Sequence, residues 1–325
     1  TGCIKDAEVT GFFYIQTDIR GFIMSMQSIN PATGQITRSF SIWQADQINT
    51  ALDQVESAQA GWAGLSYEQR GQCFRQLAQI FRQNSESYAY LITEEMGKLL
   101  REARAEIEKC AMGCEHYADH AVSYLRDEVI ASDASRSVVV YQPLGTILCI
   151  MPWNFPFWQL IRAAAPAMMA GNTVVLKHAS NVPQCALALE AAFQQASFPT
   201  HTFRTLMISA AQAEQVIADR RIAAITLTGS SAAGRKVAAI AGQHLKKCVL
   251  ELGGSDPFIV LDDADIEWTA QQALIARLQN MGQSCIAAKR FILQETIARA
   301  FVEQLQTLIS QLRSGDPKDT GTTIA

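Results

Sequence analysis

Residues 145–180 read GTILCIMPWNFPFWQLIRAAAPAMMAGNTVVLKHAS. This stretch holds two hydrophobic runs, 145–151 and 172–177, and a helical pattern lies between them at 157–169. Further hydrophobic runs follow at 222–228 and 247–252, and helical stretches at 183–196, 211–218 and 232–241 fill the intervals. Because parallel strands need crossover connections, strands that alternate with helices predict an α/β fold with a doubly wound parallel sheet. Ligands of such sheets bind at the carboxyl ends of the strands.

The segments on either side extend this plan. Apolar residues recur at three- and four-residue spacing over 46–60, 67–96 and 102–125, which predicts amphipathic helices. The β-branched run at 135–141 predicts a strand or hairpin arm near 129–144, and a helix at 265–280, a strand at 289–294 and a helix at 296–312 follow. Residues 1–25 are expected to be a leader without a functional role.

Composition limits the class of protein. The 325 residues are 49% hydrophobic and 18% charged, which suits a substantial core and about two domains. A net charge of −4 without a basic cluster disfavours nucleic-acid binding. Eight scattered cysteines lack the spacing of a disulfide framework, so we expect a reducing cytoplasm. The apolar runs at 11–15 and 21–24 are too short to span a bilayer, so we expect neither a signal peptide nor a membrane anchor.

Two features favour a nucleotide site. Lys177 ends a hydrophobic strand, and the turn from Thr228 to Gly234 joins another strand to a helix. The helix start offers free N–H groups and a positive dipole end, while glycine lets a phosphate approach the backbone. The turn departs from the G-x-G-x-x-G fingerprint, and an ordinary tight strand-to-helix turn is the alternative interpretation.

Three further residues suit catalysis. Asn154 lies between two prolines after the first strand, where its amide could face a developing oxyanion or merely cap the turn. Glu251 ends an apolar run and precedes two glycines; an apolar wall would raise its pKa, as suits a general base. Cys285 follows a helix and a glycine, although most cysteines are simply small buried hydrophobic residues.

Taken together, these motifs resemble the aldehyde dehydrogenase superfamily in order and spacing. The resemblance covers the chain from about Ile29 onward and rests on five motifs: 152–156 (PWNFP), Lys177, Gly229-Ser230 with Gly234, 251–254 (ELGG) and 282–285 (GQSC). It implies that Cys285 attacks the aldehyde, that the Asn154 amide and the Cys285 N–H hold the oxyanion, and that Glu251 activates the water that hydrolyses the thioester.

The same resemblance implies how NAD or NADP is held. Lys177 would hold the adenosine ribose and Ser230 the pyrophosphate, while Trp153, Gly229, Gly234 and Leu252 would border the cofactor. Ser180 stands where NAD-preferring relatives often have Glu. Because no carboxylate there repels a 2′-phosphate, both cofactors stay open. Residues 26–252 would form the NAD(P)-binding domain and 253–325 the start of a catalytic domain.

Substrate choice is suggested by Arg162, eight residues after Asn154 on an otherwise apolar helix. Relatives that act on succinate semialdehyde are similar in carrying Arg there, and a guanidinium binds a distal carboxylate well. An ion pair with a structural acid is the alternative. Ala287 stands where some relatives have a second cysteine, so no local disulfide switch is expected.

The chain also departs from the family. Family members continue well beyond residues 315–317, so we expect a C-terminally truncated catalytic domain, and a homo-oligomer for the full-length protein. The competing hypotheses are a cysteine hydrolase, which needs a histidine base, and an inactive nucleotide-binding fragment. A metal site among Cys110, Cys114, His116 and His120 is disfavoured, because the two pairs lie on different faces of one helix.

Overall fold

The computed structural model describes residues 25–325. The predicted leader therefore lies outside the described residues, except for Ser25, which begins the first strand. The chain starts with an antiparallel hairpin of β1 (Ser25–Ile29) and β2 (Ile36–Ser41), which the sequence analysis did not predict.

The central sheet is parallel and has the strand order β7-β6-β5-β8-β9. Its strands are β5 (Thr146–Met151), β6 (Thr173–His178), β7 (Phe203–Thr205), β8 (Ile222–Gly229) and β9 (Lys247–Leu252). Four of them match the predicted runs, so the predicted α/β fold is confirmed; β7 is an edge strand of three residues that no periodic pattern marks. The order of the strands reverses between β5 and β8, which is where ligands bind in doubly wound sheets.

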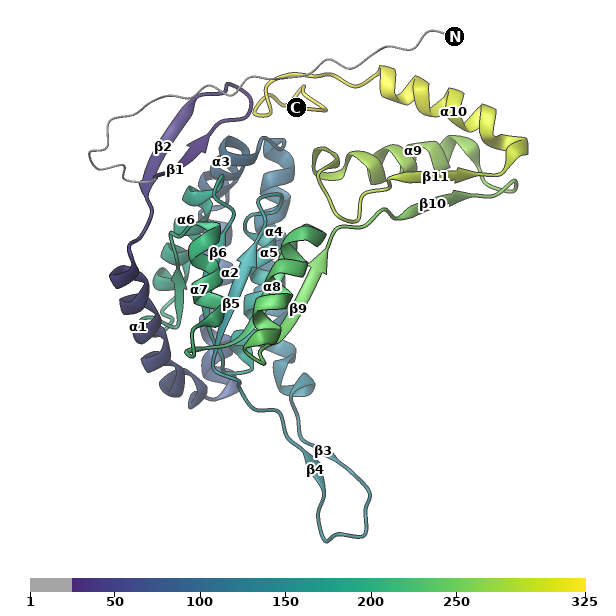
Figure 1. Ribbon diagram of the computed structural model, residues 1–325. Coiled ribbons are helices and arrows are strands. Elements are labelled where there is room, and N and C mark those ends of the chain that lie inside the picture. The colour runs from purple at the N-terminus through teal and green to yellow at the C-terminus, as the bar shows by residue number, and fades with distance from the viewer. Residues whose placement is uncertain (1–24) are drawn as a thin grey trace.

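Helices cover both faces of this sheet (Figure 1). One face packs against α2 (Tyr67–Gln83), α3 (Ser85–Met96), α4 (Leu100–Tyr124), α5 (Trp158–Met169) and α6 (Pro183–Gln195). The other packs against α1 (Ala45–Ala63), α7 (Ala210–Ala218) and α8 (Ser231–Gln243). Successive side chains of a strand point to opposite faces of the sheet, so each strand contributes to both cores. Cys149 of β5 joins the first core, and its neighbour Leu148 joins the second.

The long helical pattern predicted over 67–96 consists of two helices. Ser66 caps α2 by accepting a hydrogen bond from the Gln69 N–H, and the Gln69 side chain accepts one from the Ser66 N–H. Such a reciprocal capping box fixes where a helix begins. Asn84 ends α2 with ψ near 16°, and α3 restarts one residue later.

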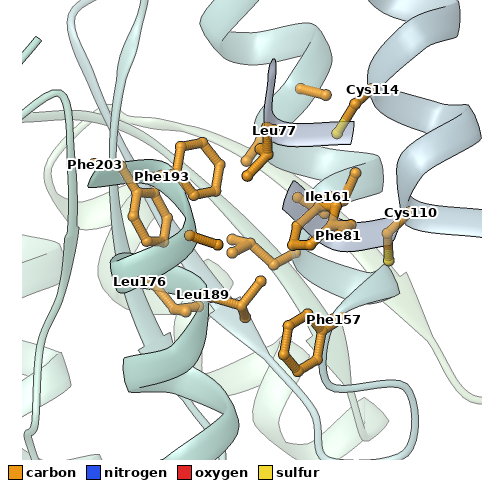
Figure 2. Packing of buried hydrophobic residues seen from close by; sticks show 14 of the residues in the cluster. Leu77, Phe81, Cys110, Cys114, Phe157, Ile161, Leu176, Leu189, Phe193 and Phe203 are labelled. Carbon is orange, nitrogen blue, oxygen red and sulfur yellow. The ribbon is translucent and has the colours of Figure 1, made fainter. Parts of the chain in front are cut away.

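The larger core is rich in aromatic side chains (Figure 2). Phe74, Phe81, Phe157 and Phe193 are fully or almost fully buried there, and their rings make edge-to-face or stacked contacts with other aromatic rings. Aromatic side chains bury large apolar areas, and these contacts fix how α2 and α5 lie on the sheet. The core therefore fixes the position of α5, and with it the turn at 152–156 that precedes this helix.

Two further units extend from this body (Figure 1). The predicted arm is an antiparallel pair, β3 (Glu128–Val129) with β4 (Val138–Val139). Beyond β9, the parallel strands β10 (Pro257–Val260) and β11 (Arg290–Leu293) pack with α9 (Ile266–Leu278) and α10 (Glu295–Ser310) around a small core of their own. The 3-10 segment η1 (Gln279–Gly282) follows α9 and leads to Cys285.

Candidate functional site

A cavity of about 350 Å³ opens at the carboxyl ends of β5, β8 and β9. The turn after β5, the turn after β8, the end of β9 and the loop after η1 line it. Seven of the predicted site residues meet there: Trp153, Asn154, Gly229, Ser230, Glu251, Leu252 and Cys285. Residues from four segments far apart in the sequence therefore face one space.

Asn154 lies beside the loop that carries Cys285. Its Nδ2 donates to the carbonyl oxygen of Gln283 at 2.8 Å, two residues before the thiol. An amide nitrogen has two N–H donors, so one remains for another acceptor. The predicted oxyanion donor is thus tied to the loop that carries the candidate nucleophile.

The loop before Cys285 adopts an unusual backbone. Asn280, Met281 and Gly282 all have φ between 58° and 71°, the left-handed region that non-glycine residues seldom adopt. Asn280 is almost completely buried; its Nδ2 donates to the Asn154 carbonyl at 2.8 Å, and its N–H donates to Glu102 Oε1 at 2.9 Å. Burial raises the pKa of Glu102. These contacts hold the strained turn that orients the thiol.

A buried ion pair holds the other side of the turn at 152–156. Lys98 Nζ and Glu106 Oε2 lie 2.5 Å apart, and both side chains are at most 1% exposed. Glu106 Oε1 also accepts the N–H groups of Phe157 and Trp158, at the start of α5. A carboxylate at a helix start is favoured by free N–H groups and by the helix dipole.

Four residues that support the site were not predicted from the sequence: Lys98, Glu102, Glu106 and Asn280. A signal was present, because Glu102 and Glu106 are spaced four residues apart and thus share one face of the predicted helix, and Lys98 lies four residues before Glu102, just ahead of α4. Glu106 lies between Ala103 and Ile107 of the core-facing stripe of α4. Charged residues on an apolar face are seldom buried without a partner, so this pattern could have been recognised.

Glu251 has different surroundings from those expected. Its side chain is 56% exposed, and instead of an apolar wall a cation lies beside it: Arg162 Nη2 is 3.4 Å from Glu251 Oε2. The same Nη2 donates to Thr228 Oγ1 at 3.3 Å. The structure therefore pairs Arg162 with the candidate general base, an acid of the site itself rather than a structural acid elsewhere.

The turn from Thr228 to Gly234 packs closely on the end of β9. Ser230 caps α8 by accepting the Ala233 N–H, with its side chain at the cavity. Gly234 is buried on the first turns of α8, and a Cβ there would lie 2.6 Å from Leu252 Cδ2. Any larger residue would displace the Leu252 side chain at the end of β9, so glycine lets α8 pack closely there, with the start of α8 at the cleft.

Lys177 lines a second cavity, of about 200 Å³, on the face of the sheet covered by α7 and α8. Burial lowers the pKa of Lys177, and no acidic neighbour contributes to that shift. Next to it, burial lowers the pKa of His178 to about 4; its Nε2 donates to the Pro156 carbonyl, and its Nδ1 accepts the Ala179 N–H. Ser180 is exposed at the end of β6 and lines neither of these cavities.

Other chemistries find less support in this part of the chain. No histidine lines the 350 Å³ cavity, although a cysteine hydrolase needs one beside its thiol. Cys110 and Cys114 are buried, whereas His116 stacks on His120 at the surface. Within residues 25–325, no group of three or more His, Cys, Asp or Glu side chains could hold a metal ion. None of the helices between these residues is both long and apolar enough to cross a membrane.

Sequence comparison gives a consistent result. The family model described as "Aldehyde dehydrogenase family" matches residues 22–325. A Synechocystis protein named "Probable succinate-semialdehyde dehydrogenase [NADP(+)]" is 51% identical over 93% of this chain, and a "Succinate-semialdehyde dehydrogenase [NADP(+)]" of Mycobacterium leprae is 46% identical over 93%. The chain spans 66% of the length of each of these two relatives.

Solved structures with the same fold include a succinic semialdehyde dehydrogenase from Streptococcus pyogenes in complex with NADP+. It is 36% identical, with a TM-score of 0.90 over 92% of this chain and 66% of its own. The structure of Gox0499, from work on its cofactor and substrate selection, is 41% identical, with a TM-score of 0.91 over 93% of this chain and 66% of its own.

Proposed function

Because the chain belongs to the aldehyde dehydrogenase family, we propose that it serves the NAD(P)-dependent oxidation of an aldehyde to a carboxylic acid, with Cys285 as the nucleophile. The observation that carries this proposal is the single cavity that Cys285, Asn154 and Glu251 share. A nucleophile, an oxyanion donor and a water-activating carboxylate are the three groups that such a reaction needs from the protein.

Each residue has one task. The Cys285 thiolate attacks the aldehyde carbon, and the free N–H of the Asn154 amide, with the Cys285 N–H, stabilises the charge on the aldehyde oxygen. A bound nicotinamide dinucleotide supplies the oxidant that removes hydride from this carbon. Glu251 then takes a proton from water, and the hydroxide oxygen displaces the sulfur from the resulting thioester.

The described residues fit a dinucleotide. The start of α8 offers Ser230 and free N–H groups to the pyrophosphate, and the close packing of Gly234 on Leu252 leaves the cleft open. Lys177 is a half-buried cation without an acidic partner, beside an apolar cavity that suits a nucleoside. Position 180 is Ser and has no carboxylate that would repel a 2′-phosphate, and the names of the relatives above give NADP+ as their cofactor. Both observations support NADP+ over NAD+.

We infer that the substrate is succinate semialdehyde, oxidised to succinate. The names of the relatives support this substrate, and so does a guanidinium, that of Arg162, in contact with two side chains that line the cavity. Arginine binds a carboxylate with paired N–H donors, which gives both charge and geometry for the distal end of a semialdehyde.

We extend the proposal to the division into domains, the location and the assembly of the protein. Residues 26–252 form the cofactor domain and 253–325 part of a catalytic domain, a division supported by the separate small core around Val260 and Phe301. The seven described cysteines are unpaired, as a reducing cytoplasm favours. Exposed Val129 and Val140 on the arm support assembly into a homo-oligomer.

The test is reduction of NADP+ by the protein with succinate semialdehyde. Cys285→Ala should abolish turnover while NADP+ binding, measured by fluorescence titration, changes less than about twofold, because the thiol acts on the aldehyde and not on the nucleotide. The matched control is Cys73→Ala, a half-buried cysteine that lies outside the cavity. Turnover that survives in Cys285→Ala refutes the assignment.

A further inference from the structure

Arg162 and Glu251 come from a helix and a strand and meet at the edge of the cavity that Cys285 also lines. Arg162 lies on α5 and Glu251 at the end of β9. Their side chains are 32% and 56% exposed, so solvent and ligands can reach the pair. Thr228, the other partner of Arg162, lines the same cavity as Glu251 and Cys285.

This ion pair conflicts with the two tasks assigned above. The Nη2 of Arg162 donates to Thr228 and faces Glu251, so a substrate carboxylate must compete for that edge of the guanidinium. A Glu251 carboxylate paired with this cation also faces Arg162 instead of a water near the thioester. Neither residue can perform its task fully while the pair persists.

We propose that Glu251 is an internal competitor for Arg162, which the distal carboxylate of the substrate displaces, and that this displacement frees Glu251 to activate water. The inference rests on the proposed function and deepens it, because it makes Glu251 a determinant of specificity as well as a base. An exposed ion pair contributes little free energy. A substrate carboxylate that binds the paired N–H donors of Arg162 can therefore displace Glu251.

Hydrolysis of the thioester follows once Glu251 is free. The released Glu251 carboxylate accepts one proton from water, the remaining hydroxide oxygen bonds to the thioester carbon, and the carbon–sulfur bond breaks. Sulfur leaves as the Cys285 thiolate, and the proton passes from Glu251 to solvent. An aldehyde without a distal carboxylate leaves Arg162 on Glu251, so its thioester is hydrolysed more slowly. The protein therefore selects its aldehyde substrate twice, when the substrate binds and when the thioester is hydrolysed.

The experiment measures succinate binding to the protein by isothermal titration calorimetry, which needs no turnover. Glu251→Gln should tighten binding about two- to fivefold, because it removes the competing charge. Arg162→Met should weaken binding about tenfold or more, because a charge-assisted pair is lost. In the Arg162→Met background, Glu251→Gln should have no effect, since there is nothing left to compete for.

The control is Glu303→Gln on α10, which makes the same change of charge beside Arg299 and outside the cavity. It should leave succinate affinity unchanged. Equal tightening by Glu251→Gln with and without Arg162 would show a general charge effect and overturn the competition, while the substrate role of Arg162 stands. No tightening by Glu251→Gln in the wild-type background overturns it as well. If Arg162→Met binds succinate normally, the substrate role itself fails, and the competition with it.

Discussion

Replacing Glu106 by Gln tests whether a buried ion pair supports the turn at 152–156. The change keeps the shape of the side chain but removes its charge. Lys98, fully buried 2.5 Å from Glu106, then loses its ion-paired carboxylate, although it keeps its contact with the Phe155 ring at 4.2 Å. Removing one partner of a buried pair costs about 3–5 kcal/mol, because the other charge stays desolvated.

A second contribution comes from the start of α5. The Gln oxygen can still accept the N–H groups of Phe157 and Trp158, which Glu106 Oε1 now accepts at 2.8 and 2.9 Å. Hydrogen bonds to a neutral acceptor are weaker than those to a carboxylate, which adds about 1 kcal/mol. We therefore expect the free energy of unfolding to fall by about 5 kcal/mol in Glu106→Gln.

Urea denaturation, followed by circular dichroism, measures this loss. Glu108→Gln is the matched control: it lies two residues further along α4, and its carboxylate pairs with Arg82 at the surface. Such an exposed pair should cost no more than about 1 kcal/mol. The double variant Lys98→Met with Glu106→Gln should recover most of the stability, because no buried charge remains. A difference between Glu106→Gln and Glu108→Gln below about 1 kcal/mol would refute the reasoning.

Two further predictions concern the cofactor cleft and pH. Gly234→Ala should push Leu252 into the cleft and weaken NADP+ binding at least about threefold, while the higher helix propensity of Ala keeps the free energy of unfolding within about 1 kcal/mol. The control is Gly242→Ala, which has open space at its Cβ and should leave NADP+ binding unchanged. Equal affinities of the two variants for NADP+ would contradict this prediction. His178 stays neutral when folded, with its pKa lowered to about 4, whereas the unfolded chain binds a proton below about pH 6.5. The free energy of unfolding should therefore fall by about 3 kcal/mol from pH 6.5 to 4, and His178→Gln, whose amide can still donate to Pro156, should flatten this slope; parallel pH profiles of the two proteins would count against it.

The sequence allowed most of the fold to be predicted because its signals are local. Strands β5, β6 and β8 are largely apolar runs followed by helical periodicity, and a sheet buried on both faces requires such runs. The missed elements are short or half-exposed: β7 has three residues and β10 four, and β2 has no fully buried residue. Such strands owe their conformation to their partners, which a single segment does not reveal.

The site divides in the same way. Cys285, Asn154 and the turn at 228–234 could be predicted, because glycines, prolines and a cysteine at strand ends mark their positions along the chain. Only the tertiary structure decided that Arg162 faces Glu251, that Glu106 holds the start of α5, and that Asn280 joins two loops. These contacts join residues between 51 and 126 positions apart, and spacing along the chain carries no information about which distant charges will share a buried space.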